Sequence, residues 1–505
     1  MTILKYETIP SSFLYVILAW LFLLVLSSCK TEKHEKEIAV YNKHCATCHV
    51  APKINELPKT IWKNSILPDM FSRMEIENIN KDKYQGPFKS ETTDFKPKIS
   101  VNDVLLLEQF ILSTAPDKLE VNQIPKMEQL ESFEQIPIAL DYKNGSAITY
   151  LDYSRDISKL YFGTVSGELG TYDFESKEVN IEFQGETPIT WFNQGDTISY
   201  VTEIGLFAPS ELEQGVISKI RKKNTQKIFE KFHRPVHTLV QDLNNDGKNE
   251  LVISEFGNET GRLSMLVEND KSNFEKTVLL NQSGCIRTVA KDMNHDGMLD
   301  LVVLTSQGRE GITILYQKRG FEFEAKNILK FSPVYGSSWF ELIDYNNDGF
   351  IDIVTVNGDN ADKSYVQKPY HGMRIHLNDG KGNYEESYFY ALNGATRLAA
   401  ADFDQDGDMD FGLIGSFPDY ERAPQASFVY LENINSKKFD FKTKILKNPD
   451  AGRWFLMDAE DIDDDGDEDI VLSSLTYTFS PTPEDLLKHW SETNVDLMVL
   501  KNKLR

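Results

Sequence analysis

A nine-residue acidic pattern that recurs five times constrains the fold of this 505-residue chain more than any other feature. Each copy has Asp at positions 1 and 5, Asn or Asp at position 3, glycine at position 6 and an acidic residue at position 9. The copies begin at Asp242, Asp292, Asp344, Asp402 and Asp461, so successive starts lie 50, 52, 58 and 59 residues apart. Periods of this length are typical of repeat architectures, propellers and solenoids among them.

The oxygen-bearing side chains of each copy suit a hard cation. Calcium takes six to eight oxygen ligands, and a glycine at position 6 permits the sharp turn that brings them together. We therefore predict up to five bound Ca²⁺ ions. The predicted ligands are Asp242, Asn244, Asp246, Glu250, Asp292, Asn294, Asp296, Asp300, Asp344, Asn346, Asp348, Asp352, Asp402, Asp404, Asp406, Asp410, Asp461, Asp463, Asp465 and Asp469.

An EF-hand is the obvious alternative for such loops, and the twelfth position decides against it. An EF-hand has glutamate there, whereas these copies have Ile253, Val303, Thr355, Leu413 and Leu472. Each copy also runs directly into a β-rich apolar segment, which predicts loops between strands. A simple Asp-Gly turn would explain one copy but not five in the same register.

Two further units with the same strand–turn–strand shape precede the five. Residues 148–162 and 189–201 keep the apolar runs but lack the complete nine-residue acidic pattern. Seven units over roughly 370 residues are the size of a seven-bladed β-propeller. We expect the apolar segment 497–501 to close the ring with the first blade.

A second motif, Cys45-Ala-Thr-Cys48-His49, lies near the N-terminus. This is the pattern of covalent c-type haem attachment, in which two thiols bond the haem and the adjacent histidine binds the iron. A thioredoxin-like redox pair would need a βαβ context, and a zinc site would need a second such pair. We therefore predict one covalent haem on Cys45 and Cys48, with His49 as the proximal ligand.

Helices are expected on both sides of this motif. Residues 35–43 and 61–74 have helical composition, and Pro68 should kink or start the second helix. Ser100 and Asp103 form a capping box that opens a third helix, which ends at Ala115-Pro116.

The distal haem ligand is less determined. Met70 and Met74 lie four residues apart on one helical face. We favour Met70, with Met74, another ligand or an open site as alternatives, and both methionines could simply fill the core. His44 is expected to be an exposed neighbour of the motif.

The extreme N-terminus indicates export. Residues 13–26 are an uninterrupted apolar run, shorter than the about 20 residues that span a bilayer but suited to a signal peptide. The following Leu26-Ser-Ser-Cys29 resembles a bacterial lipobox, which implies cleavage after residue 28 and lipidation of Cys29. The alternative is an ordinary signal peptide with an incidental cysteine. The resemblance implies an outer-membrane lipoprotein of a Gram-negative bacterium, facing the periplasm or the cell surface.

The five acidic motifs resemble the FG-GAP/VCBS repeats of integrin-α-like propellers. The whole chain resembles exported bacterial proteins that join a haem-binding cytochrome c domain to such a propeller, and four further segments carry this likeness: 335–338, 357–360, 368–372 and 416–420. The expected fold is multidomain, with a small all-α cytochrome c domain before an all-β seven-bladed propeller with calcium-binding loops. The expected division is a signal peptide at 1–28, a charged tether at 29–35, the cytochrome c domain at 36–115, a linker at 116–136 and the propeller at 137–503.

Composition argues against one class of function, nucleic-acid binding. The net charge of −24 argues against nucleic-acid binding, which needs a basic surface, and much of that charge lies in the predicted calcium loops. With 40% hydrophobic residues the chain can form real cores. The fourth cysteine, Cys285, is expected to be a buried small apolar residue rather than a reactive thiol.

Two functional hypotheses remain open. In the first, the protein is a membrane-tethered electron carrier whose propeller docks a redox partner protein. In the second, the propeller is itself a catalytic or glycan- or protein-binding head, and the haem is an electron outlet or sensor. Polar residues that could line a propeller pocket are His371, Arg309, Glu310, Asp359 and Asp419. Inter-blade packing is the plainer explanation for them, and whether the chain is an enzyme is left open.

Overall fold

A computed structural model describes residues 34–76, 98–140, 145–222, 224–257, 259–361, 364–477 and 480–504. The predicted signal peptide and Cys29 lie outside these residues. Among the described helices, none is long and apolar enough to cross a membrane.

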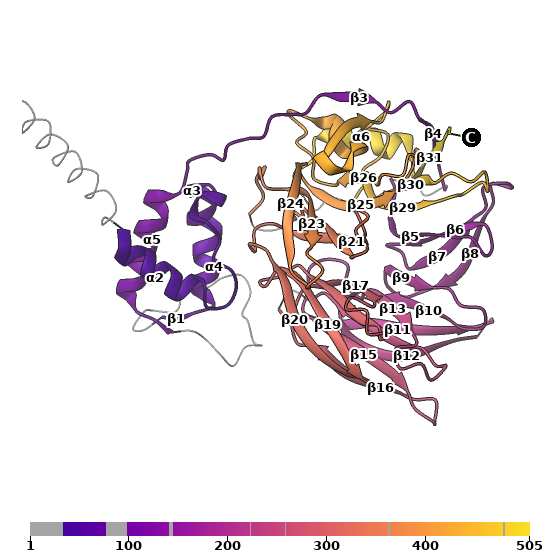
Figure 1. Ribbon diagram of the computed structural model, residues 1–505, viewed down its shortest axis with the longest axis horizontal. Helices are drawn as coiled ribbons and strands as arrows, with labels where there is room; N and C mark the ends of the chain where they lie inside the picture. Colours follow the sequence, from indigo (N-terminus) through magenta and orange to yellow (C-terminus); the bar gives the residue numbers. More distant parts are fainter. Residues whose placement is uncertain are drawn as a thin grey trace, which may run out of the picture.

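The N-terminal region is a small helical unit around its own apolar core (Figure 1). Buried Trp62, Phe71, Val104 and Ile111 form the centre of that core. A short parallel pair joins β1 to β2. The elements are α2 (Glu35–Cys45), η2 (Ile54–Glu56), α3 (Lys59–Ile61), η3 (Trp62–Ile66), α4 (Leu67–Ser72), β1 (Glu75–Ile76), β2 (Lys98–Ile99) and α5 (Val101–Thr114).

Local sequence explains how two of these helices begin. Pro68 occupies the first turn of α4, where its missing N–H costs no hydrogen bond, and the wider π-helical turn η3 precedes it. The Ser100 side chain accepts a hydrogen bond from the Asp103 N–H at 3.1 Å, and α5 ends at Ala115. Both expectations, a helix start at Pro68 and a cap at Ser100, are confirmed.

The rest of the described chain forms a seven-bladed β-propeller of four- and five-stranded sheets (Figure 1). Strands are given from the inner strand outward. The first sheet consists of β5 (Ile148–Ser154), β6 (Lys159–Thr164), β7 (Glu168–Tyr172) and β8 (Val179–Gln184), and the second of β9 (Ile189–Asn193), β10 (Ser199–Glu203), β11 (Glu213–Arg221) and β12 (Asn224–His233). The third consists of β13 (Pro235–Gln241), β14 (Glu250–Glu255), β15 (Arg262–Glu268) and β16 (Phe274–Leu280), and the fourth of β17 (Cys285–Lys291), β18 (Asp300–Thr305), β19 (Gly311–Arg319) and β20 (Glu322–Lys330).

The last three sheets complete the ring. The fifth sheet consists of β21 (Ser337–Ile343), β22 (Asp352–Asn357), β23 (Gly372–Asn378) and β24 (Tyr384–Ala391). The sixth has five strands, β25 (Ala395–Ala401), β26 (Asp410–Gly415), β27 (Phe428–Asn435), β28 (Asp440–Ile445) and β3 (Met127–Gln129). The seventh consists of β29 (Trp454–Glu460), β30 (Asp469–Ser474), β31 (Leu497–Asn502) and β4 (Phe133–Ile138). Outside the sheets lie η5 (Pro424–Ser427), η6 (Ser436–Lys438) and α6 (Glu484–Thr493).

The order of strands gives the propeller two distinct ends. The first strand of each sheet contacts the first strands of its neighbours, so these seven strands surround the axis. The five acidic loops join first to second strands, and the loops from second to third strands therefore lie at the opposite end. Five of the second strands, β14, β18, β22, β26 and β30, are buried along their whole length. The acidic motifs are thus loops between strands, as predicted, and not EF-hands.

The ring is closed by both ends of the propeller sequence. Strand β31 pairs with β30 on one side and with β4 on the other, so the C-terminal strand closes the ring within the last sheet rather than by joining the first. Residues 127–129 add strand β3 to the neighbouring sheet. Part of the segment expected to be a linker, 116–136, is therefore sheet.

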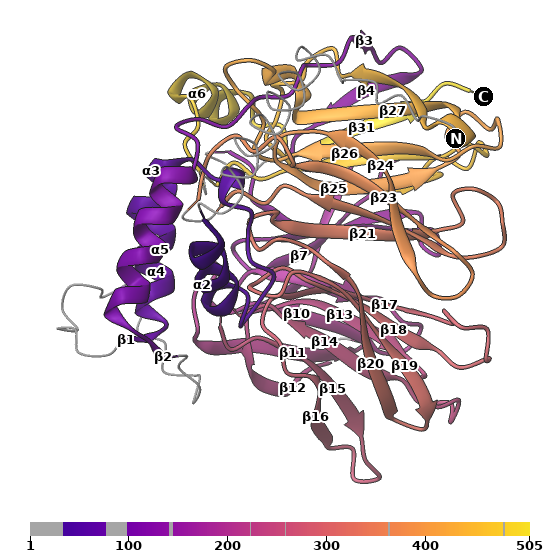
Figure 2. The same cartoon turned by 60° about the vertical axis from the view of Figure 1, so that its left-hand side comes forward.

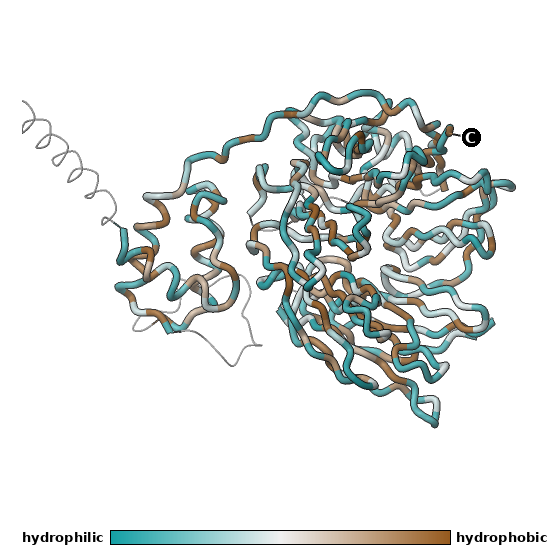
Figure 3. Tube along the Cα trace, viewed as in Figure 1, coloured by the Kyte–Doolittle hydropathy of each residue, from teal (hydrophilic) through white to brown (hydrophobic). Residues whose placement is uncertain are grey.

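The helical region lies against one end of the propeller (Figure 2). Val334 of the β20–β21 connection is buried in the helical core, and Tyr335 and Tyr370 pack beside it. Within the propeller, apolar segments, coloured brown, alternate with hydrophilic segments, coloured teal (Figure 3). Cys285 is fully buried, as expected.

Candidate functional site

The Cys45–His49 turn follows directly from helix α2. Cys45 is the last residue of α2 and packs against the helical core, whereas Cys48 is exposed. Burial raises the pKa of the Cys45 thiol to about 12. A thiol with a raised pKa is a weak nucleophile at neutral pH, which argues against a thioredoxin-like redox pair at this position.

The His49 ring is oriented by the backbone beside it. Its Nδ1 lies 2.8 Å from the Val50 carbonyl oxygen, which can only accept, so Nδ1 carries the proton and donates it. The lone pair then resides on Nε2, the atom free to bind a metal. Thr47 steadies the turn by donating its hydroxyl to the Lys43 carbonyl at 2.7 Å. Cys45 and Cys48 are the residues that would hold a covalently attached haem, and His49 Nε2 is the atom that would bind its iron.

The positions of Met70 and Met74 do not show which of them would be the distal iron ligand. Met70 and Met74 are both half-buried, and Met74 packs against the helical core. The arrangement does not select between them. His44 was expected to be exposed, and this is wrong: it is buried, and its Nε2 lies 3.0 Å from the Asp103 carboxylate of α5.

The propeller contacts the helical region through loops at the end opposite the acidic motifs. Arg309 donates from Nε to the Cys48 carbonyl at 2.8 Å. Glu56, which is buried, accepts from the Ser332 hydroxyl at 2.7 Å, and its carbonyl accepts from the Tyr370 hydroxyl at 2.8 Å. Sequence reasoning missed Glu56 and Ser332. No local signal marks them, because they are 276 residues apart.

Two further features belong to this interface. Arg73, just after α4, forms an ion pair with Glu259 of the β14–β15 loop at 2.8 Å. A cleft of about 310 Å³ opens between the two parts of the chain. Its lining includes Val50 and Lys53 of the helical region and Phe331 and Tyr335 of the propeller.

The structure does not gather the proposed pocket residues of the propeller around one open cavity. His371 is 1% exposed, and burial together with Lys368 and Arg374 holds its pKa well below the usual range. Asp359 and Asp419 each accept backbone N–H groups of their own loops, from Ala361 and from Glu421 and Arg422. These contacts organise loops, and we derive no catalytic role from them.

Glu310 differs from the other pocket residues because it anchors a loop between two blades. Its carboxylate accepts from the Gly336 N–H at 3.2 Å, from the Ser337 N–H at 2.9 Å and from the Ser337 hydroxyl at 2.7 Å. Burial nevertheless raises the pKa of this carboxyl to about 7.

The five acidic loops share one backbone conformation. In each loop the residue at position 4 has a left-handed backbone with φ between 56° and 59°, and the glycine at position 6 has φ between 83° and 97°. The position 1 carboxylate accepts the N–H groups of positions 5 and 6, as Asp242 does from Asp246 at 3.2 Å and from Gly247 at 2.8 Å. The repeated acids thus converge on the inside of a tight turn.

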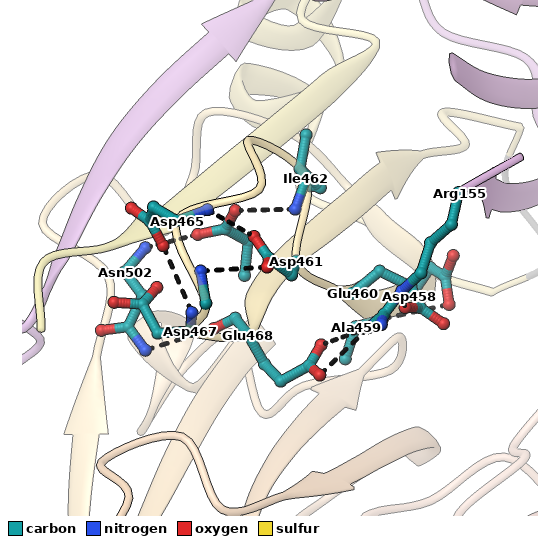
Figure 4. A network of polar contacts seen from close by, with 12 residues as sticks. Arg155, Asp458, Ala459, Glu460, Asp461, Ile462, Asp465, Asp467, Glu468 and Asn502 are labelled. Atoms are coloured by element: carbon teal, nitrogen blue, oxygen red, sulfur yellow. Dashed lines mark hydrogen bonds and ion pairs between the residues drawn. The ribbon is translucent and has the colours of Figure 1, made fainter. Parts of the chain in front are cut away.

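The fourth and fifth loops bring three carboxylates together. Oxygens of Asp402, Asp404 and Asp406 lie within 4.8 Å of one another, as do those of Asp461, Asp463 and Asp469. Figure 4 shows the fifth loop, where Asp461 accepts from the Asp465 and Gly466 N–H groups. Such groupings suit a calcium ion, which would offset the repulsion among the carboxylates.

The acid at position 9 is buried in all five loops and ties each loop to its sheet. Asp469 accepts from the Ile462 N–H at 3.2 Å and from the Asn502 N–H of β31 at 2.7 Å. Burial raises the pKa of Asp469 and of Asp410 to about 7. These carboxyls have a structural role within the blade whether or not they also bind a cation.

Comparison with known proteins agrees with the propeller. The family model of the FG-GAP-like repeat matches residues 292–355, which include the whole of the second and third acidic loops. The chain therefore contains a seven-bladed β-propeller with FG-GAP-like repeat sequence. No curated protein matches the chain.

Two solved structures are among those to which the chain is similar. The N-terminal domain of Nup159 has a TM-score of 0.39 and 11% identity, over 75% of this chain and 98% of that chain. The Pan2 WD40 domain of Neurospora crassa has a TM-score of 0.44 and 12% identity, over 74% of this chain and 97% of that chain.

Proposed function

We propose that this chain is a monohaem c-type cytochrome fused to a calcium-binding β-propeller, and that it carries electrons to or from a redox partner protein. The observation that supports this most is the Cys45–His49 turn, in which the Val50 carbonyl leaves His49 Nε2 available for iron. Cys45 and Cys48 would hold the haem, and Met70 or Met74 would complete its ligands. Bound there, the haem would take up and release one electron.

The propeller supplies a docking surface in this proposal. A propeller with FG-GAP-like repeat sequence suits a binding role, and here its loops already hold the helical region through Glu56, Ser332 and Tyr370. The partner protein would meet the surfaces that this contact leaves free. For the second hypothesis, a catalytic or glycan- or protein-binding head, the candidate residues of the propeller do not favour a pocket, because His371 is buried and Asp359 and Asp419 bind backbone N–H groups of their own loops.

The haem is tested by producing the full chain in a bacterium that attaches c-type haem. A pyridine haemochrome spectrum and haem staining of a denaturing gel should show one covalent haem per chain. The Cys45→Ala/Cys48→Ala variant should lose it, whereas Cys285→Ala, which alters a buried cysteine of the propeller, should keep it. A wild-type chain without covalent haem would overturn the proposal.

Carbon monoxide then separates the two functional hypotheses. A reduced haem with two protein ligands should not bind CO rapidly, and this would support electron transfer. Rapid CO binding would reveal an open iron position and favour the catalytic or sensing alternative. Met70→Leu and Met74→Leu identify the distal ligand, because only the ligand's loss should open the iron to CO.

The membrane anchor is a separate element of the proposal and is supported by the sequence 26–29 alone. Attached acyl chains would hold the protein at the outer membrane without a spanning helix. Cys29→Ser should release the protein from the membrane fraction. Retention of Cys29→Ser in that fraction would contradict lipidation at this residue.

A further inference from the structure

Both segments that carry candidate iron ligands lie next to contacts with the propeller. Cys48, within the haem-attachment turn, accepts a hydrogen bond from Arg309 at 2.8 Å. Arg73, between Met70 and Met74 in sequence, pairs with Glu259 at 2.8 Å. The Val50 and Ala51 side of the interface cleft directly follows His49. The predicted haem surroundings therefore face the propeller and are not enclosed by helices alone.

Arg309 is held in place by the loop that carries it. Its carbonyl accepts from the Thr305 hydroxyl at 2.9 Å and from the Gln282 side-chain amide at 2.8 Å. The next residue, Glu310, is buried and bonded to Gly336 and Ser337 of the neighbouring blade. The backbone of Arg309 is thus fixed on both sides, and its side chain reaches out from a rigid base.

The Arg309 guanidinium uses only one of its three nitrogens in this contact. Nε donates to the Cys48 carbonyl, and the side chain is exposed. Among the residues that the structure describes, no acceptor lies within hydrogen-bond distance of its two terminal nitrogens. The cleft formed by the neighbouring residues is lined by Lys53 and Lys330 and also by Glu56 and Glu386, so these four charges offset one another. The positive charge next to the haem-attachment turn is therefore that of Arg309 itself.

We propose that the propeller completes the haem site, with Arg309 as a positioning residue that holds the Cys45–His49 turn and places a positive charge beside it. This inference rests on the proposed haem attachment. Ferric haem carries one more positive charge than ferrous haem, so a nearby cation destabilises the ferric form and raises the reduction potential. The propeller would thereby set how readily the haem accepts an electron.

The test is the reduction potential of the purified full chain, measured by spectroelectrochemistry. Arg309→Gln removes the charge and should shift the potential downward, so that at a fixed solution potential the ferrous-to-ferric ratio falls several-fold. Arg309→Lys keeps a positive charge but lacks the Nε–H, and its reduction potential should stay closer to that of the wild type than that of Arg309→Gln. The matched control is Arg319→Gln, at the other end of the same blade. Arg319 lies roughly 30 Å away along the strand, well beyond the screening length of about 8–10 Å.

Each outcome has a distinct meaning. A lower potential for Arg309→Gln, with Arg319→Gln unchanged, supports the inference. Equal potentials for wild type and Arg309→Gln, with haem attached and circular dichroism unchanged, overturn the inference and leave the proposed function standing. A wild-type chain without covalent haem overturns both. If Arg309→Gln does not fold, Arg309→Ala, which removes the same charge and the same Nε–H, is measured in its place, and a potential equal to that of the wild type overturns the inference.

Discussion

Single residues show how far local sequence can predict a role. Cys45, Cys48 and His49 lie within five consecutive residues, so their motif can be recognised from the sequence alone. From sequence, Arg309 is one of several polar residues that could line a propeller pocket, with inter-blade packing as the plainer explanation; in the structure its Nε donates to the Cys48 carbonyl. That contact joins residues 261 positions apart, and only the folded chain brings them together.

Glu310 carries the first prediction, which concerns stability against pH. Its pKa is raised from an ordinary value of 4.5 to about 7, so the native state holds this proton over a range in which the unfolded state has lost it. The free energy of unfolding must then fall as pH rises from about 4.5 to 7. The shift corresponds to at most about 3 kcal/mol.

Glu310→Gln isolates this effect, because glutamine does not titrate. Urea unfolding of both proteins at pH 5 and pH 8 should show a smaller loss of stability for the variant between the two values. Asp410 and Asp469 also have a pKa of about 7, and they contribute the same pH dependence of the unfolding free energy to both proteins. Identical pH slopes would contradict a buried, protonated Glu310.

At the scale of elements, predictability follows the range of the interactions. The five acidic loops and the strands that flank them were predicted because their signals lie within nine consecutive residues and repeat. The helix at Ser100 was predicted for the same reason, since a cap acts across three residues. Strands β3 and β4 were missed. Residues 127–129 and 133–138 show little apolar alternation, and their partners are at the far end of the sequence.

The cap of α5 gives an element-scale prediction. Ser100→Ala leaves the Asp103 N–H without its acceptor and should destabilise the helical region by about 1 kcal/mol. Ser113→Ala is the matched control, because that hydroxyl only donates to the Phe110 carbonyl inside the helix. Hydrogen exchange of the α5 amides should be faster in Ser100→Ala alone. Equal exchange in the two variants would show that the cap contributes nothing.

The acidic loops give a second element-scale prediction, which tests calcium. Removing calcium with EGTA should lower the melting temperature, because a site filled at 100 times its dissociation constant contributes about 2.7 kcal/mol. Asp406→Asn removes one carboxylate from the fourth loop and should reduce the calcium-dependent part of the stability. Asp379→Asn is the control: Asp379 accepts from the Lys381 and Asn383 N–H groups in a hairpin without the motif.

Calorimetry with and without EGTA makes this comparison directly. Melting that is the same in calcium and in EGTA would show that the loops are stable turns held by their own hydrogen bonds. A calcium effect that Asp379→Asn reduces as much as Asp406→Asn would assign it to surface charge rather than to the loop.

At the scale of the whole molecule, the residues before the first blade contact the propeller at two places. Their helices lie against the loops of three blades, and their strand β4 pairs with β31 over residues 133–138. Ring closure thus pairs a strand that precedes the first blade in sequence with the last strand of the last blade. An open ring would leave β31 as an unpaired edge, which favours association between chains.

Truncation separates these two contributions. A chain that begins at Met127 loses the helical region and keeps β3 and β4, whereas a chain that begins at Gly145 also loses both strands. We expect the first to remain folded and monomeric by light scattering, and the second to melt at lower temperature and associate. Equal melting of the two would mean that the propeller closes without β4.

Phe133 allows the same question to be asked without removing a strand. Its side chain is 1% exposed and meets Phe403 and Tyr430 edge-on, at ring distances of 6.0 and 5.5 Å. It therefore joins β4 to the core between the last two blades. Phe133→Ala should cost about 3–5 kcal/mol of unfolding free energy by leaving a cavity there. Ile136→Ala, in the same strand but 38% exposed, should cost far less. Urea unfolding measures both, and equal losses would show that β4 contributes through its backbone pairing with β31 and not through Phe133.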